Sequence, residues 1–267
     1  MLRCSTSKGD RTVMSTPTNG KGNDKLDGAI VAVAGAAGPA GRAVLLRLVK
    51  ARATVAAADA NAMRLADAVD AARPARSGAI LSSDTVDLLD LDATRAWADR
   101  TEKEFGRIDG LVHLVGGWRG SATFAETELA HWQSLEKLLI RTVQHTSLAF
   151  EAPLRRSGQG RYVLISAAAA SKPTAGNAAY AACKAAAEAW TLALADSFHK
   201  EGSDSQPRAA AVILIVKALL YDAMRTERPH ADWFVGPKVS PIPHLDFRCR
   251  PGFRRSPTIW VCPRSGR

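Results

Sequence analysis

Tyr180 and Lys184 lie four positions apart in an alanine-rich run, residues 177–186. On a helix this spacing places both side chains on one face, so the lysine ammonium can reach the neighbourhood of the phenol. A free phenol has a pKa of about 10, and a nearby cation lowers that pKa by favouring the phenolate. The pair therefore predicts a general acid/base for a carbonyl or alcohol oxygen. Because the pattern is also common in ordinary helices, the rest of the chain must support this interpretation.

A glycine-rich turn near the start of the chain gives the first support. The apolar run 29–34 precedes Gly35, Gly38 and Gly41, and the amphipathic segment 42–50 follows them. This order predicts a buried strand, a tight turn and a helix. Glycines permit close approach of the backbone to a pyrophosphate, and the helix N-terminus offers free N–H groups. A plain turn remains the alternative.

Asp59 gives the second support, because it ends another short apolar run at residues 53–58. An acidic residue in this place can accept hydrogen bonds from the ribose hydroxyls of a dinucleotide and would repel a 2′-phosphate. The sequence therefore favours NAD over NADP as the cofactor. The alternative is that Asp59 is a solvated residue at the end of a strand or caps the helix expected to begin near Asn61.

With these elements in order, the chain resembles the short-chain dehydrogenase/reductase family over roughly residues 28–225. The resemblance implies that the tyrosine exchanges a proton with the substrate, while the lysine holds the nicotinamide ribose and lowers the tyrosine's pKa. It also implies that the glycine turn holds the pyrophosphate and that the first aspartate of the segment 86–90 contacts the adenine. The cofactor-binding residues implied in this way are Gly35, Gly38, Gly41, Asp59, Asp87, Gly116, Tyr180 and Lys184.

Two supporting polar residues of the family are missing. The serine expected thirteen positions before the tyrosine is Ala167, and the helical asparagine expected seven positions after Trp132 is Leu139. Ser166 precedes Ala167, but a shift of one residue on a strand turns a side chain to the opposite face. Ser166 is therefore a candidate catalytic residue only if the strand bulges there.

The segment after the fourth expected strand also departs from the family. Of the usual Asn-Asn-Ala-Gly only the glycine, Gly116, is present, and His113 occupies the first position. His113 could act in catalysis from the carboxyl end of a strand, but a buried histidine that donates to a backbone carbonyl is the preferred interpretation. Trp118 and Arg119 either line a substrate pocket or lie on an exposed loop.

Alternating strand and helix patterns predict one Rossmann-like, doubly wound parallel sheet with three layers, α/β/α. Strands are expected near residues 30–34, 53–58, 79–83, 109–115, 161–166 and 210–216. Helices are expected near residues 40–51, 61–72, 92–106, 130–152 and 177–200, the last of them capped by Asn177.

Charge and composition divide the chain into a flexible extension at 1–28, a dinucleotide-binding domain at 29–232 and an irregular basic tail at 233–267. The formal net charge is +10, and the tail contributes most of it with seven Lys/Arg against one Asp/Glu. The central domain carries 24 basic against 22 acidic residues. A basic stripe that would indicate nucleic-acid binding is therefore not expected.

The tail is rich in proline, arginine and serine, which do not sustain helices or interior strands. In the family this region holds the last helix and a seventh strand, and the Pro-Gly that usually follows the sixth strand is replaced by residues 217–218. We expect the sheet to lack its seventh strand and interpret the tail as a non-homologous replacement, for example from a shifted reading frame. A genuine flexible extension is the alternative.

The sequence contains no secretory signal pattern, no apolar run of transmembrane length and no Cys-x-x-Cys pairing. It therefore predicts a cytoplasmic oxidoreductase without a metal site that transfers hydride between NAD and a ketone or secondary alcohol. A homo-oligomer is possible, and neither a nucleic acid nor a membrane is an expected partner. An inactive nucleotide-binding sensor or partner subunit is the alternative function. A nucleotide-sugar epimerase is disfavoured because no substrate domain follows residue 225.

Overall fold

Six parallel strands form one sheet in the order β3-β2-β1-β4-β5-β6. The computed structural model describes residues 26–200, the last of these by its backbone only, and residues 209–216. The strands are β1 (Ile30–Ala34), β2 (Thr54–Asp59), β3 (Leu81–Thr85), β4 (Gly110–His113), β5 (Arg161–Ala167) and β6 (Ala210–Val216). The Rossmann-like α/β fold expected from the sequence is confirmed.

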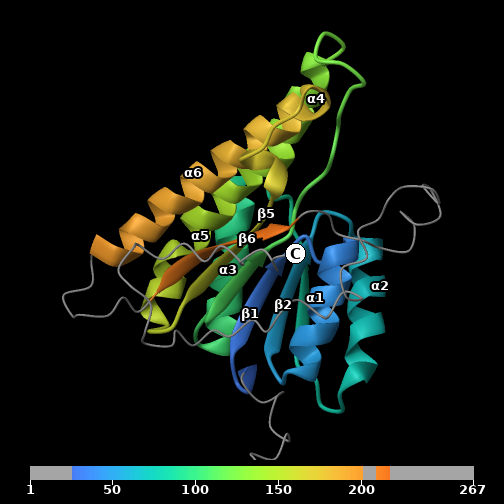
Figure 1. Cartoon of the computed structure of the whole chain (residues 1–267). Helices are drawn as coiled ribbons and strands as arrows, with labels where there is room; N and C mark the ends of the chain where they lie inside the picture. The colour runs from blue at the N-terminus through green and yellow to red at the C-terminus, as the bar shows by residue number, and fades with distance from the viewer. Residues whose placement is uncertain (1–25, 201–208, 217–267) are drawn as a thin grey trace, which may run out of the picture.

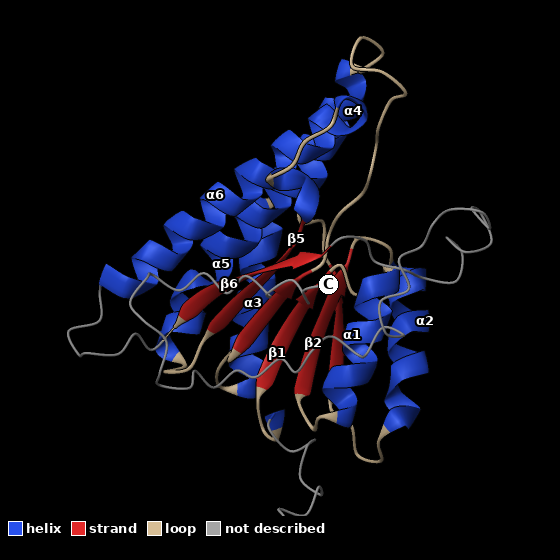
Figure 2. Ribbon diagram, viewed as in Figure 1, coloured by secondary structure: helices blue, strands red, loops and turns tan. Residues whose placement is uncertain are grey.

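Helices cover both faces of the sheet, as Figure 2 shows. They are α1 (Pro39–Lys50), α2 (Ala62–Ala72), α3 (Leu91–Phe105), α4 (Leu129–Glu136), α5 (Thr142–Arg156) and α6 (Ala178–Lys200). Alternate residues of β1 face opposite layers, because side chains of a strand alternate between the two faces. Val31 and Val33 pack with the apolar residues of α1 and α2. Ala32 and Ala34 pack with residues of α3, α5 and α6.

The strand order reverses between β1 and β4, which are neighbours in the sheet but not in the chain. Ala34 at the end of β1 pairs with His113 at the end of β4. In open parallel sheets ligands bind in the crevice beyond the carboxyl ends of the strands at such a reversal. Figure 1 shows α4 and the first turns of α6 extending past this edge of the sheet. The fold thus brings the loops after β1, β2, β4 and β5 and the start of α6 to one edge.

Three boundaries differ from the sequence-based expectation. Strand β3 begins two residues later than expected, at Leu81, and its four other residues are polar. The helix expected at 130–152 is divided by a π-helical turn, Lys137–Arg141, between α4 and α5. Asn177 does not cap α6 directly. It forms a capping box with Thr174, whose backbone N–H donates to Asn177 Oδ1 at 2.8 Å. A short 3₁₀ turn therefore precedes the helix.

The flexible extension, the irregular tail and the missing seventh strand expected from the sequence fall almost entirely on residues 1–25 and 217–267, outside the described residues. Across the part of the chain that is described, none of the helices is both long enough and apolar enough to cross a membrane.

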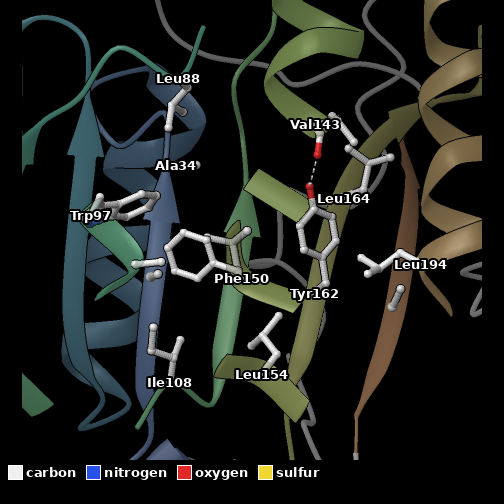
Figure 3. Packing of buried hydrophobic residues seen from close by; sticks show 14 of the residues in the cluster. Ala34, Leu88, Trp97, Ile108, Val143, Phe150, Leu154, Tyr162, Leu164 and Leu194 are labelled. Atoms are coloured by element: carbon white, nitrogen blue, oxygen red, sulfur yellow. Dashed lines mark hydrogen bonds between the residues drawn. The ribbon is translucent and has the colours of Figure 1, made fainter. Parts of the chain in front are cut away.

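The core between the sheet and helices α3, α5 and α6 is centred on Phe150 and Trp97 (Figure 3). Both are fully buried, and their rings meet edge to face with centroids 4.8 Å apart. We expect Phe150→Ala to lower the free energy of unfolding by about 3–5 kcal/mol, because it removes a buried ring and leaves a cavity. Leu148→Ala on the same helix is the control, since Leu148 is 53% exposed. Urea denaturation of both variants measures the difference, and equal losses would contradict the assigned core.

Candidate functional site

The glycine turn after β1 is packed too closely for side chains at two positions. Gly35 has φ of +81°, and a Cβ there would lie 2.8 Å from the backbone nitrogen of Val115, which follows β4. A Cβ on Gly41 would lie 2.4 Å from the carbonyl oxygens of both Gly35 and Ala36. Gly41 therefore lets α1 rest directly on the turn, and Gly35 lets the turn rest on the end of β4.

The N-terminus of α1 is open to an anion. Gly38 is the N-cap of this helix, Pro39 follows it, and no side chain caps the first turn. The first turn also contains no acidic residue. A Cβ on Gly38 would lie 3.5 Å from its nearest neighbour, the Gly35 carbonyl oxygen, so a methyl group fits there in ordinary van der Waals contact. Uncapped N–H groups and the positive end of the helix dipole suit the pyrophosphate of a dinucleotide.

Asp59 links the end of β2 to the glycine turn. Its Oδ2 accepts a hydrogen bond from the backbone N–H of Ala37 at 3.0 Å, and its Oδ1 accepts one from Asn61 at 3.1 Å. Asn61 itself caps α2, since its side chain accepts from the Arg64 N–H at 2.9 Å. Asp59 therefore holds the turn, and its partly exposed carboxylate lies at the edge formed by the carboxyl ends of the strands.

Two further candidate cofactor residues lie on loops at the same edge. Asp87 follows β3, is exposed, and accepts from the backbone N–H of Leu89 at 2.9 Å. Gly116 follows β4 and is exposed, and a Cβ there would lie 3.5 Å from Leu139. Asp59, Asp87 and Gly116 thus follow three different strands whose carboxyl ends share one edge.

Lys184 is anchored to the end of β5. Its side chain is buried, with the residue 8% exposed, and Nζ donates to the carbonyl oxygen of Ile165 at 2.8 Å. Strand β4 pairs with β5 only as far as Leu164, whereas β5 continues to Ala167. The lysine thus bonds to β5 beyond the end of its neighbouring strand, where the crevice begins.

Tyr180 lies one turn before Lys184 on α6 and is partly buried. Its ring packs beside an apolar cluster that includes Leu139 and Cys183. Its hydroxyl has no hydrogen-bond partner among the described residues. The fold therefore places the predicted pair together on α6, at the edge that also holds the glycine turn.

The electrostatics of the pair differ from the sequence-based expectation. Burial raises the pKa of Tyr180, whereas the spacing alone predicted a lowered pKa. Burial also lowers the pKa of Lys184 to about 8, and the charge of Glu188 opposes this decrease. The lysine ammonium is directed to Ile165 and not to the phenol. Burial of the Tyr180 ring thus outweighs any effect of the lysine cation on the pKa of the phenol.

Ser166 is not available to a substrate in this structure. Strand β5 pairs with β6 without interruption through Ala167, so the bulge that would turn Ser166 into the crevice is absent. Ser166 is 1% exposed and donates to Glu188 Oε1 at 2.5 Å. Leu139 is also buried, in the apolar cluster below Tyr180. The two polar groups that the family usually supplies are thus replaced by apolar side chains, and we do not retain Ser166 as a catalytic residue.

His113 is buried in a network of hydroxyl groups. Its Nε2 lies 3.2 Å from Thr142 Oγ1 and its Nδ1 lies 3.1 Å from Thr146 Oγ1. Thr142 Oγ1 donates to the Leu138 carbonyl, and Thr146 Oγ1 also lies 2.9 Å from the Tyr162 hydroxyl. Thr146 Oγ1 donates to the Thr142 carbonyl at 2.8 Å, so either threonine hydroxyl can accept the single ring N–H of a neutral imidazole. The histidine is buried as preferred, but its partners are hydroxyls and not a backbone carbonyl.

His113 makes the stability of the fold sensitive to acid. Burial, with a smaller contribution from the charge of Lys184, lowers the pKa of His113 to about 3, well below its value in the unfolded chain. The unfolded state therefore takes up a proton near pH 6.5 that the folded state does not, and stability falls as pH decreases through this value. From pH 7 to pH 5 this group should cost about 2 kcal/mol.

The test compares urea denaturation of the wild type and His113→Gln at pH 7 and pH 5. We expect the variant to be less stable at pH 7 but to lose about 2 kcal/mol less than the wild type on acidification. Equal losses in the two proteins would show that the histidine does not remain neutral in the folded state.

The loops after β4 and β5 meet beside the start of α6. The Ser121 N–H donates to the Gly176 carbonyl at 3.0 Å, and a Cβ on Gly176 would lie 2.6 Å from the Ser121 oxygen. Arg119 lines a small recess there with Asn177, and Arg119 Nη1 donates to the Trp118 carbonyl at 2.8 Å. These contacts fix the loop next to the turn that leads to Tyr180.

The described residues thus combine a glycine turn before an uncapped helix N-terminus, an acidic residue at the end of β2 and a phenol with a lysine one turn away. A phenol beside a nicotinamide can donate a proton to a carbonyl oxygen or accept one from an alcohol. The residue that sequence reasoning missed is Glu188. Its signal was its position four residues after Lys184, which places both on the same face of α6.

Known proteins resemble this chain along most of the described domain. Residues 29–204 match the profile of the short chain dehydrogenase family. The chain is 30% identical over 172 residues to a Mycobacterium tuberculosis protein assigned as the oxidoreductase SadH. That match covers 63% of this chain and 60% of the relative, so the chain spans about 60% of the relative's length. An acetoacetyl-CoA reductase of Allochromatium vinosum is 28% identical over 174 residues, with 65% of this chain and 70% of the relative covered.

A solved structure with a nicotinamide cofactor is also similar. It is an NADPH-bound short chain oxidoreductase of Pseudomonas aeruginosa PAO1, described as containing an atypical catalytic center. It is 28% identical with a TM-score of 0.68, and the match covers 77% of each chain. The fold, the glycine turn and the profile agree, and the chain belongs to the short chain dehydrogenase family.

Proposed function

We propose that this protein is an NAD-dependent oxidoreductase that interconverts a ketone and a secondary alcohol. The observation that carries the proposal is the position of Tyr180 and Lys184 on α6, one turn apart, with the lysine bonded to the end of β5. Membership of the short chain dehydrogenase family and the resemblance to an acetoacetyl-CoA reductase support it. We also propose that the protein acts in the cytoplasm and that it assembles into a homo-oligomer.

In the proposed mechanism Tyr180, Lys184 and the N-terminus of α1 each have a separate role. When bound in the crevice, a nicotinamide would supply or accept the hydride. Tyr180 donates its phenolic proton to the carbonyl oxygen during reduction and accepts a proton from the alcohol during oxidation. Lys184 binds the ribose hydroxyls, and its ammonium stabilises the phenolate that forms after the proton leaves. The N-terminus of α1 binds the pyrophosphate.

Ala167 affects the expected rate, because it offers no hydroxyl to the developing oxyanion at the position where the family has a serine. Loss of one such donor can cost on the order of a hundredfold in rate. We therefore expect slow turnover, with Tyr180 as the principal donor to the substrate oxygen.

A second candidate function is nucleotide binding without turnover. It is favoured by the apolar Ala167 and Leu139 and by the raised pKa of Tyr180. Quenching of tryptophan fluorescence measures NADH binding, and oxidation of NADH with a panel of ketones measures turnover. Binding with turnover that requires Tyr180 supports the oxidoreductase, whereas binding without any such turnover supports the sensor or partner subunit.

Asp59 is expected to determine the preference for NADH. A carboxylate at the ribose position repels a 2′-phosphate, although a related structure holds NADPH. Asp59→Asn keeps an oxygen for the Ala37 N–H and removes the charge. We expect the ratio of the dissociation constants for NADPH and NADH to fall about tenfold, corresponding to about 1.4 kcal/mol of repulsion.

The control for this change is Asp70→Asn on α2, which removes the same charge at an exposed position. Binding of both cofactors is measured by titration at one ionic strength, because screening weakens exposed charges. An unchanged ratio of the NADPH and NADH dissociation constants in Asp59→Asn would show that this carboxylate does not discriminate between the two cofactors.

A further inference from the structure

Ser166 and Glu188 join β5 to α6 directly beside the lysine of the proposed site. The Ser166 hydroxyl donates to Glu188 Oε1 at 2.5 Å, and Lys184 Nζ donates to the carbonyl of the preceding residue, Ile165, at 2.8 Å. Glu188 lies four residues after Lys184 on α6, so both side chains lie on the face that packs against β5. The Glu188 carboxylate and the Lys184 ammonium thus come from one turn of α6, and they contact the adjacent residues Ser166 and Ile165 of β5.

The ammonium of Lys184 is costly to keep charged in this place. The residue is 8% exposed, and burial of a cation without compensation disfavours the charged form. One neutral carbonyl accepts from Nζ, and Glu188 provides the opposing negative charge. Two further titratable groups of the described residues lie near Lys184, namely His113 on β4, which is neutral, and Tyr180 on α6, which is a neutral phenol. Neither of these two offsets the cation.

Ser166 limits the positions that Glu188 can occupy. The hydroxyl comes from a strand held on one side by the continuous ladder with β6, so its position is fixed by the sheet. A hydrogen bond from a hydroxyl to an ionised carboxylate is stronger than a hydrogen bond between two neutral groups. This contact therefore keeps the Glu188 carboxylate turned toward β5, where the lysine also lies.

We propose that Glu188 is a positioning residue for Lys184, and that the Ser166 hydroxyl holds the Glu188 carboxylate so that the lysine remains an ammonium facing the cofactor crevice. The proposal rests on the proposed role of Lys184 in binding the nicotinamide ribose. It gives Ser166 a role in the site that acts through Glu188 and not on the substrate.

The titration of Lys184 tests this proposal without any assay of turnover. The full-length, cofactor-free protein is labelled with ¹³C and ¹⁵N lysine, and the Lys184 side-chain signal is assigned by its loss in Lys184→Arg. In Glu188→Gln we expect this signal to titrate at least about one pH unit lower than in the wild type, a tenfold loss of proton affinity. Glu104→Gln, an exposed change on α3, is the matched control and should leave it unchanged.

Ser166→Ala gives a second, independent variant if Glu188→Gln does not fold. In Ser166→Ala the Lys184 signal should also titrate at a lower pH than in the wild type, but by a smaller amount. The Glu188 carboxylate remains in this variant and only its hydrogen bond to Ser166 is lost. A Lys184 titration within about 0.2 pH units of the wild type in the folded variants overturns the proposal. NADH binding should weaken at a lower pH in Glu188→Gln, since the ammonium is lost there first.

The result is distinguishable from a failure of the proposed function. If the wild type shows no turnover dependent on Tyr180 and the Lys184 titration still moves in Glu188→Gln, the electrostatic role of Glu188 stands and the oxidoreductase proposal fails. If turnover requires Tyr180 and the titration does not move, only the role of Glu188 is wrong.

Discussion

Replacing Tyr180 by phenylalanine is expected to reduce kcat/KM for ketone reduction by about 10²–10⁴, the range that a general acid contributes. The substitution keeps the ring that packs beside the cluster under α6 and removes only the hydroxyl, which has no hydrogen-bond partner among the described residues. The fold and the affinity for NADH should therefore remain as in the wild type. Steady-state oxidation of NADH and fluorescence titration measure the two quantities.

Tyr162→Phe is the matched control for this change, since it removes the hydroxyl of a fully buried tyrosine in the core. It should lower stability because Tyr162 lies in the network with Thr146, but it should leave kcat/KM per folded molecule nearly unchanged. If Tyr180→Phe retains more than half of the wild-type kcat/KM, then the phenol does not transfer the proton.

The pH dependence of Tyr180 gives an additional observation in the same experiment. Burial raises the pKa of this phenol, so the protonated form that reduction needs should persist throughout the neutral range. Alcohol oxidation needs the phenolate and should increase as pH rises. The same assays across a pH series measure both trends.

Gly41→Ala is expected to have the largest effect on cofactor binding. The added Cβ would lie 2.4 Å from two carbonyl oxygens of the turn, Gly35 and Ala36, and backbone atoms cannot rotate away. Helix α1 must then move from the turn, which should cost about 1–3 kcal/mol of stability and displace the N–H groups that hold the pyrophosphate. We expect affinity for NADH to fall by at least about tenfold, because loss of only about 1.4 kcal/mol of binding free energy has this effect.

Gly38→Ala provides the comparison within the same turn. Gly38 has φ of −69°, and the nearest atom to a Cβ added there is 3.5 Å away, so alanine fits without strain. Its unfolding midpoint should match the wild type, while a methyl group facing the phosphate position should weaken NADH binding. Urea denaturation and NADH titration separate the two effects. Equal stability of Gly41→Ala and Gly38→Ala would contradict the packing described for α1.

The sequence predicts the sheet well because five of its six strands are strongly apolar. Runs such as residues 29–34 are typical of buried strands, and the glycines that follow them fix the turns. Strand β3 is the exception, since Ser82 and three polar residues after it form an edge strand that hydrophobicity does not detect. The π-helical turn at Lys137–Arg141 has no local sequence signal, so the helix around it was expected to be regular.

The sequence predicts which residues lie in the candidate site better than it predicts their pKa values and contacts. The spacing of Tyr180 and Lys184 predicts that both lie on one face of α6. The alternation of side chains along a strand predicts that Ser166 and Ala167 point to opposite faces of the sheet. Spacing does not reveal burial, however, and burial reverses the expected direction of the Tyr180 pKa. The contact between Ser166 and Glu188 joins positions 22 residues apart, and only the packing of α6 on β5 shows it.

The most direct test of the account is a crystal structure of the protein with NAD. We expect the pyrophosphate at the N-terminus of α1, the adenosine ribose on Asp59 and the nicotinamide ribose within hydrogen-bond distance of Lys184 Nζ. The Tyr180 hydroxyl should then face the reactive side of the nicotinamide ring across a space that one carbonyl group fills. A nicotinamide bound away from α6, or a Tyr180 hydroxyl turned into the apolar cluster beside Leu139, would contradict the proposed chemistry.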